Sequence, residues 1–356
     1  MNELANPRPR RFGAQFLVTV LLVLIAAAAG AAVMYFVQVR KPLEANVDAN
    51  RRLQLALAGS DEGMHLADTF TDANGDMVAD PPTDPSKLID PPTLTFCYIA
   101  QDDEDKYKEL WKPFCDHLSK VTGKPVEYLP LYSTEDQLKA LQEGKLMVTA
   151  LNTGSVPLAV NVCGFVPVCR VPTNDPSGMH IEVIVPPSSS ITKPQDLKNQ
   201  ELVLTQPTSN SGYKAPMVLL KSRFGIEPEK DYFVRMSQTH EKSIEGIASG
   251  EYPAAAVASD MLARAELNGQ ITKDKYRSIY KSESFPSAAL GYVYNLKPDL
   301  AAKIKDAMLS YDIKGSPLES EFVVQDQTKF IPVNYQNDWA LIRRIDEQSA
   351  QLRANR

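Results

Sequence analysis

From residue 94 onward, short apolar runs alternate with amphipathic segments. Leu94–Ile99 predicts a buried strand, and Asp105–Val121 carries apolar residues at helical spacing before Gly123. Further strands are predicted over residues 126–131, 147–151, 165–171, 181–185, 201–205, 233–236 and 254–258, and helices over 134–144, 194–198, 216–224, 241–249 and 260–267. This alternation predicts an α/β fold with parallel sheets, in which ligands bind at the carboxyl ends of the strands.

The N-terminus holds an uncharged apolar run over residues 16–38 that is long enough to span a bilayer. Arg8, Arg10 and Arg11 precede it, so residues 1–15 are expected in the cytoplasm and the bulk in the periplasm or outside the cell. The alternative is a signal peptide cleaved near the small residues 26–32. Because apolar residues continue past that point, we expect an uncleaved single-pass anchor in the inner (cytoplasmic) membrane.

Residues 39–92 are rich in Pro and Asp and contain few aromatic residues, which predicts a semi-extended tether. Within it, Asp72–Asp76 faintly resembles a calcium loop. Gly75 and Thr83 do not fit that loop's glycine and terminal glutamate positions, so no metal site is expected.

Composition narrows the functional classes. The 356 residues are 44% hydrophobic with a net charge of −6 and no basic stripe, which argues against a nucleic-acid partner. Four cysteines show no metal-binding spacing; they are either buried thiols or, for Cys163 and Cys169, a small disulfide loop. We expect no cofactor. No catalytic triad or nucleophile elbow is readable, so the chain is not expected to be an enzyme.

A polar loop, Ser209–Asn210–Ser211, precedes a helix that has Pro216 in its first turn. Free N–H groups and hydroxyls at a helix N-terminus suit a tetrahedral oxyanion such as phosphate, although an ordinary Ser/Asn cap would share this pattern. A second polar helix start, Asn152–Ser155, follows the strand at 147–151 and is placed to face the first across a cleft.

Six motifs in order resemble the phosphate/phosphite/phosphonate substrate-binding proteins of ABC transporters. The resemblance covers residues 93 to about 312. The motifs are Leu110–Phe114 around Lys112-Pro113, Leu138–Gly144, Ile191–Lys198, Ser209–Tyr213 with Pro216, Ser237–His240 and Ala258–Asp260.

The resemblance implies a two-lobed (type II) periplasmic-binding fold whose chain crossings lie near 183–187 and 284–290. Lobe one would comprise 93–184 and 286–335, lobe two 185–285, and a C-terminal helix 336–356. It also implies that the anion is held by Ser209, Asn210, Ser211, Gly212 and His240. Asp260 would accept from a protonated oxygen or an ammonium, or else act as a helix N-cap. The implied partners are a small anionic ligand and an ABC permease.

The first lobe departs from the family, because Val156 and Thr134 stand where tyrosines are usual. The first-lobe half of the site is then expected to consist of small polar residues, namely Thr134, Asn152, Thr153 and Ser155. The ligand's identity therefore stays open, and a membrane-tethered sensor or assembly protein with the same fold is the alternative function.

Overall fold

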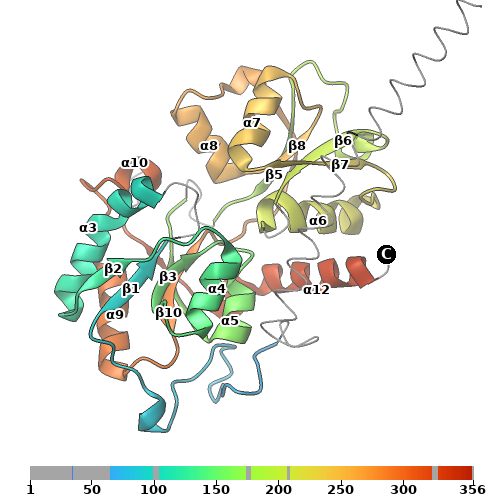
Figure 1. The fold of residues 1–356 in the computed structure, drawn as a ribbon. Helices are drawn as coiled ribbons and strands as arrows, with labels where there is room; N and C mark the ends of the chain where they lie inside the picture. The colour runs from blue at the N-terminus through green and yellow to red at the C-terminus, as the bar shows by residue number, and fades with distance from the viewer. Residues whose placement is uncertain are drawn as a thin grey trace, which may run out of the picture. The chain divides into compact units, whose positions relative to one another are not determined.

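The computed structural model describes residues 34, 65–98, 104–173, 178–206, 209–322 and 328–354. Within these residues the chain forms two α/β lobes, each built around its own sheet (Figure 1). Both sheets are mixed rather than wholly parallel. Each has a parallel core, to which strands from the chain crossings are added in antiparallel orientation.

The first sheet has six strands in the order β11 (Ile331–Pro332), β4 (Phe165–Arg170), β10 (Ala289–Val293), β3 (Val148–Leu151), β1 (Leu94–Cys97) and β2 (Val126–Tyr128). Helices α3 and α9 cover one face, and α4 and α5 cover the other (Figure 1). The bounds of the first-lobe helices are α3 (Glu104–Thr122), α4 (Thr134–Gln142), α5 (Val156–Cys163), α9 (Pro298–Ser310) and α10 (Glu319–Phe322).

The second sheet has five strands in the order β7 (Phe233–Gln238), β6 (Glu201–Thr205), β8 (Ala255–Ala258), β5 (Ile181–Val185) and β9 (Arg277–Lys281). Around it lie the short 3-10 turns η4 (Pro194–Leu197) and η6 (Lys273–Lys275), the π turn η5 (Asn210–Lys214), and helices α6 (Ala215–Phe224), α7 (His240–Ser249) and α8 (Ser259–Leu267).

Strand alternation gives this sheet two hydrophobic faces. Leu202 and Leu204 of β6 belong to the large core on one side, whereas Val203 between them packs with Ile244 and Ile247 of α7 on the other. Accordingly, α6 lies on one face of the sheet and α7 and α8 lie on the opposite face (Figure 1).

The first chain crossing differs from the predicted position. The chain leaves the first sheet after Arg170 and enters the second at Ile181, so β5 belongs to the second sheet rather than to lobe one as predicted. The return runs from Lys281 to Ala289 and overlaps the predicted 284–290. The sequence pattern of an apolar strand such as β5 is compatible with either sheet. Only its antiparallel pairing with β8 and β9 assigns it.

The crossings are hydrogen-bonded to each other. Met179 pairs with Phe285, and Val171 N donates to Ala288 O at 3.1 Å. Gly178, at φ +125°, makes this approach possible, because a Cβ there would lie 2.0 Å from Phe285 O.

Residues 65–92, which fall within the predicted tether, lie along lobe one. Ala67 N donates to Asn161 O at 2.9 Å, and Ile89 N donates to Asn295 O at 2.8 Å. A short 3-10 turn, η3 (Pro85–Lys87), lies in this segment. The calcium-like loop is closed by its own residues, because the Asp72 carboxylate accepts from the backbone N–H groups of Asp76 and Met77.

The four cysteines all lie within the described residues and are buried without forming a disulfide. Burial raises the pKa of Cys97, Cys115 and Cys163 to about 12, so these thiols stay protonated at neutral pH. In the same part of the chain, no group of three or more His, Cys, Asp or Glu is placed to hold a metal ion.

The helices at the C-terminal end are α11 (Tyr335–Asp338) and α12 (Ala340–Ala354), in the region predicted as a helix over 336–356. None of the helices in the described ranges combines the length and apolarity needed to cross a bilayer. The predicted anchor, residues 16–38, lies outside those ranges apart from Met34.

Candidate functional site

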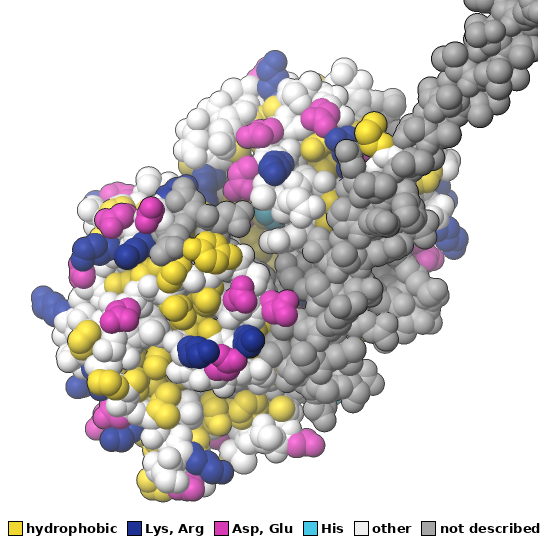
Figure 2. All heavy atoms as spheres, in the orientation of Figure 1, with side chains coloured by type: hydrophobic (Ala, Val, Ile, Leu, Met, Phe, Trp, Pro, Cys, Tyr) yellow, Lys and Arg dark blue, Asp and Glu magenta, His cyan; other side chains and the backbone are white. Residues whose placement is uncertain are grey.

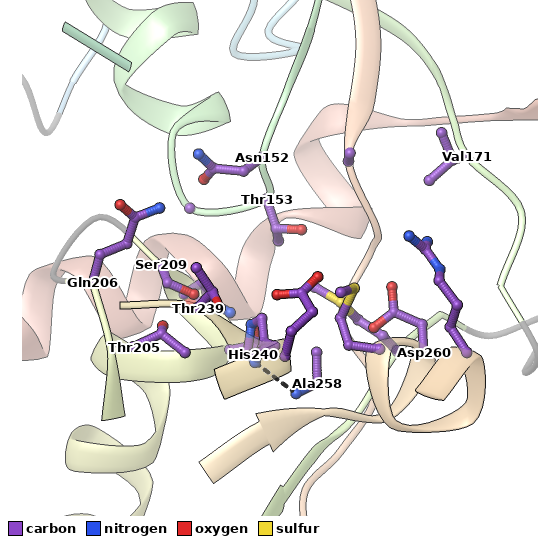
Figure 3. Close-up of a pocket in the computed structure, with 18 of the residues that line it drawn as sticks. Asn152, Thr153, Val171, Thr205, Gln206, Ser209, Thr239, His240, Ala258 and Asp260 are labelled. Atoms are coloured by element: carbon purple, nitrogen blue, oxygen red, sulfur yellow. Dashed lines mark hydrogen bonds between the residues drawn. The ribbon is translucent and has the colours of Figure 1, made fainter. Parts of the chain in front are cut away.

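A cavity of about 280 Å³ lies where the carboxyl ends of the parallel strands of both lobes meet. Lobe two contributes residues that follow β6, β7 and β8, and lobe one contributes residues that follow β1 and β3. The crossing segments close the space between them through Val171, Met179 and Ala288. Figure 3 shows the polar side chains that gather around this cavity.

The turn after β6 places Ser209, Asn210 and Ser211 on the cavity wall. Ser209 caps the turn, because its Oγ accepts from Gly212 N at 3.0 Å, and its hydroxyl hydrogen stays available for donation. Gly212 does not line the cavity. A Cβ there would lie 2.0 Å from Thr205 Oγ1, so glycine lets the turn press against the end of β6.

Buried polar atoms at this wall are suited to bind a polar ligand. Asn210 is 2% exposed, yet neither its Nδ2 nor its Oδ1 has a hydrogen-bond partner among the described residues. Thr205, 1% exposed, likewise has an Oγ1 without a partner in that part of the chain. Unpaired buried polar groups are costly, and both residues line the same cavity. A ligand with several acceptor oxygens would satisfy the donors.

His240 takes part through Ser211. Its Nδ1 accepts from Ala258 N at 3.3 Å, so the ring proton resides on Nε2, which faces Ser211 Oγ at 3.3 Å. Burial lowers the pKa of His240 below its ordinary value of 6.5, although the carboxylates of Asp260 and Glu241 oppose this shift. A neutral ring that donates to Ser211 Oγ leaves the Ser211 hydroxyl hydrogen free to point toward a ligand oxygen.

The opposite part of the lobe-two wall is charged. Glu241, Asp260 and Arg264 all line the cavity. Asp260 is not the helix N-cap, because α8 begins after Ala258, and its buried Oδ1 has no partner among the described residues. This carboxylate is placed to accept a hydrogen from a protonated oxyanion or from an ammonium group.

Only part of the predicted first-lobe set reaches the cavity. Asn152 and Thr153 line it, whereas Thr134 and Ser155 do not. Ser155 Oγ donates to Asn152 Oδ1 at 3.0 Å, so it orients the neighbouring amide. The Thr153 hydroxyl donates to Pro286 O at 2.8 Å in the return crossing. Thr134 is the first residue of α4, after its cap Ser133.

Sequence reasoning missed an aromatic wall formed by Tyr98, Tyr107 and Phe322. Tyr98 stacks on Tyr107 with ring centroids 5.9 Å apart and meets Phe322 edge-on at the same distance. Tyr98 follows the first strand of the fold, and that place at a strand's carboxyl end is the signal that could have identified it. Phe322 arrives from more than 200 positions away in the chain, so no local pattern marks it.

Acidic and basic side chains are interspersed on the face drawn in Figure 2, and a continuous basic stripe is absent from the described residues on that face.

Comparison with known proteins agrees with this architecture. Residues 96–339 match the family described as the phosphonate periplasmic substrate-binding protein of ABC transporters. A binding protein component of an ABC phosphonate transporter from Pseudomonas aeruginosa has a similar fold, with a TM-score of 0.57 and 18% identity over 75% of this chain and 98% of that one.

Two further solved structures share the fold. PhnD1 from Prochlorococcus marinus, in complex with methylphosphonate, has a TM-score of 0.59 and 16% identity over 74% of this chain and 99% of that one. A Xanthomonas citri protein bound to ATP has a TM-score of 0.60 and 19% identity over 74% and 98%. At these identities the structures establish the fold alone.

The family match covers more than half of the chain and confirms the resemblance read from its motifs. It also confirms the expectation of a binding protein rather than an enzyme. The chain therefore belongs to the phosphonate-type periplasmic substrate-binding proteins of ABC transporters.

Proposed function

We propose that this protein is a membrane-anchored, extracytoplasmic receptor that captures a small phosphorus oxyanion for an ABC permease. The phosphonate, phosphite or phosphate group would bind at the Ser209–Ser211 turn. The observation that carries this proposal is the buried amide of Asn210, which lines the cavity without a partner among the described residues. The helix that follows this turn adds a favourable dipole at the same point.

In this proposal the hydroxyls of Ser209 and Ser211 and the Asn210 amide donate to the anion. Thr205 lies beside them, and its hydroxyl has no partner in the part of the chain that the structure describes. His240 acts mainly by orienting Ser211, since its Nε2 faces the Ser211 hydroxyl. Gly212 shapes the turn, and Ser155 and Thr134 are supporting residues rather than direct contacts.

The carboxylates Glu241 and Asp260 favour a ligand that carries a hydrogen-bond donor or a positive charge in addition to its anionic group. A phosphonate that keeps one proton can donate it to Asp260, whereas fully ionised sulfate cannot. A ligand ammonium could be neutralised by the same pair. The aromatic wall of Tyr98, Tyr107 and Phe322 would contact the organic part of the ligand, in place of the tyrosines that lobe one lacks at 134 and 156.

The anchor would be residues 16–38, with residues 1–15 in the cytoplasm and both lobes outside. This arrangement keeps the receptor near its permease.

Calorimetry on the purified full-length chain tests the ligand class. Phosphate, phosphite, methylphosphonate and 2-aminoethylphosphonate are titrated separately, with sulfate as the matched tetrahedral control. We expect heat of binding with at least one phosphorus oxyanion and none with sulfate. A folded protein that binds none of the four would refute the proposal.

A further inference from the structure

Lys214 lies at the C-terminal end of the turn that carries Ser209, Asn210 and Ser211. Unlike those three residues it does not line the cavity. Its side chain is only 12% exposed, so its ammonium group is largely withdrawn from water. A buried lysine needs partners for its charge and its hydrogen-bond donors.

The partners of Lys214 come from two other parts of the fold. Its Nζ donates to Gly154 O of lobe one at 3.0 Å and pairs with Asp346 Oδ1 of α12 at 2.5 Å. The Asp346 side chain is 17% exposed, so this ion pair is shielded from solvent screening. A neighbouring ion pair, Lys221 with Glu227 at 3.3 Å, stays within lobe two and is more exposed.

Gly154, which accepts the hydrogen bond from Lys214, is itself part of the candidate site. It lines the cavity, as do the two residues before it, Asn152 and Thr153. Trp339, immediately before α12, donates from Nε1 to Thr153 O at 3.1 Å, so adjacent carbonyls of one loop are bound by lobe two and by the C-terminal region.

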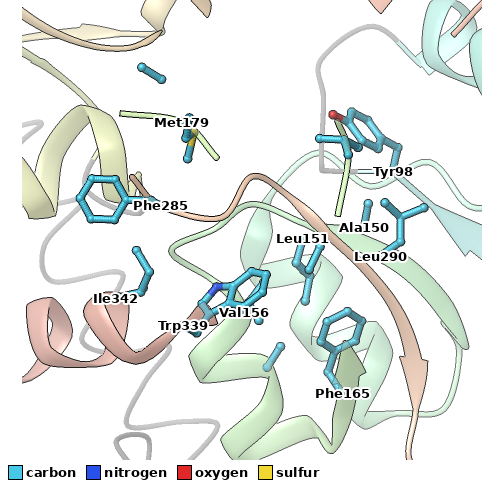
Figure 4. Close-up of a cluster of buried hydrophobic side chains, with 14 of the residues drawn as sticks. Tyr98, Ala150, Leu151, Val156, Phe165, Met179, Phe285, Leu290, Trp339 and Ile342 are labelled. Carbon is cyan, nitrogen blue, oxygen red and sulfur yellow. The ribbon is translucent and has the colours of Figure 1, made fainter. Parts of the chain in front are cut away.

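Apolar packing reinforces this junction. Trp339 and Ile342 are fully buried and lie near Val156 of lobe one and Phe285 of the return crossing (Figure 4). Helix α12 also packs against α6 and the η5 turn of lobe two (Figure 1). The C-terminal helix thus contacts both lobes beside the crossings, and Lys214 supplies the polar connection.

We propose that Lys214, paired with Asp346, is an interlobe latch: a positioning residue that holds the Ser209–Ser211 turn at the correct distance from the Asn152–Gly154 loop. Lys214 does not touch the ligand. It keeps the two halves of the site in a binding-competent arrangement, so that ligand affinity depends on it. The affinity part of this inference rests on the proposed function of the cavity.

The latch predicts a specific pattern among variants of the full-length chain in detergent. Lys214→Met removes the ammonium and retains the stem. The double variant Lys214→Met/Asp346→Leu removes both charges, so that no unpaired carboxylate remains to unfold the protein. Lys214→Arg keeps the positive charge, so it should retain much of the wild-type label distance and ligand affinity. Lys221→Met on the neighbouring helix is the matched control, because it removes an ion pair confined to lobe two.

The first measurement is the distance between spin labels on the two lobes without ligand. Labels are placed through Lys139→Cys on α4 and Glu245→Cys on α7, both exposed, while the native cysteines are buried. Wild type and Lys221→Met should share one distance distribution. Lys214→Met and the double variant should shift it or broaden it.

The second measurement is titration with methylphosphonate. If the binding-competent fraction falls to about one tenth, the apparent Kd rises about tenfold in the Lys214→Met and double variants. At saturation their label distances should return to the wild-type value. An unchanged ligand-free distance, or an unchanged Kd, in the folded double variant would overturn the latch. Should wild type bind no oxyanion, the proposed function fails, and the ligand-free distances still decide whether Lys214 holds the lobes.

Discussion

Replacing Asn210 by Asp is the sharpest test of the anion site, because it changes one NH₂ group into an oxygen with almost no change in shape. Asn210 is 2% exposed, and its amide has no partner among the described residues. If its Nδ2 donates to a bound anion, the substitution removes that donor and sets a negative charge against the ligand.

The size of the effect follows from Coulomb's law. Two like charges about 4 Å apart repel by about 4 kcal/mol at the effective dielectric constant of about 20 that suits protein sites. Loss of a charge-assisted hydrogen bond adds about 1.5–3 kcal/mol. Since each 1.4 kcal/mol is about tenfold in affinity, we expect Asn210→Asp to weaken methylphosphonate binding by about three orders of magnitude or more at pH 8.

The assay is calorimetric titration of wild type, Asn210→Asp and the control Asn199→Asp, which makes the same chemical change at an exposed position of lobe two. Burial raises the pKa of a carboxyl group, and a protonated carboxyl can donate. Binding by Asn210→Asp should therefore recover partly as the pH is lowered toward 5. Wild-type affinity of Asn210→Asp at pH 8 would refute the idea that Asn210 faces the anion.

Three further outcomes follow from the site and the anchor. Ser211→Ala should weaken binding about ten- to hundredfold by calorimetry, since it removes one donor to the anion; Ser222→Ala, whose hydroxyl bonds within α6, should not. Because burial lowers the pKa of His240 below 6.5, the unfolded chain binds more protons between that value and the folded pKa. In urea unfolding, the free energy of unfolding should thus be highest above pH 6.5 and should fall as the pH drops through the folded pKa. His240→Gln should flatten this fall, and an identical pH profile in both proteins would contradict the neutral ring. N-terminal sequencing and fractionation should find the intact N-terminus in the membrane, whereas a mature N-terminus near Val33 in the soluble fraction would show cleavage.

Local chemistry explains why several features could be predicted from the sequence. The strands β5 and β6 were predicted with the bounds observed, because their apolar runs are short and end in turn residues. The Ser209–Ser211 turn was recognisable because Pro216 marks the first turn of a helix and Ser209 is a typical cap. Such signals depend on neighbours within a few residues, so they can be recognised in the sequence without knowledge of the fold.

Other site features depend on residues far apart in the chain. The family resemblance implied His240 as a ligand of the anion. Folding places its ring at the cavity, between Ala258 N–H and Ser211 Oγ, and this placement assigns its tautomer. The aromatic wall joins Tyr98 to Phe322, and no periodicity links these positions.

The sequence by itself determined the α/β alternation, the family motifs and the polar turn, because these follow from local preferences of the backbone and from hydrophobic periodicity. Tertiary structure alone decided that β5 belongs to the second sheet, that residues 65–92 lie along lobe one, and that Lys214 reaches Gly154 and Asp346. The physical reason is common to all three. A strand edge, an extended backbone and a long charged side chain can each form hydrogen bonds or ion pairs with many partners. Which partner lies within reach is decided only when the chain is packed.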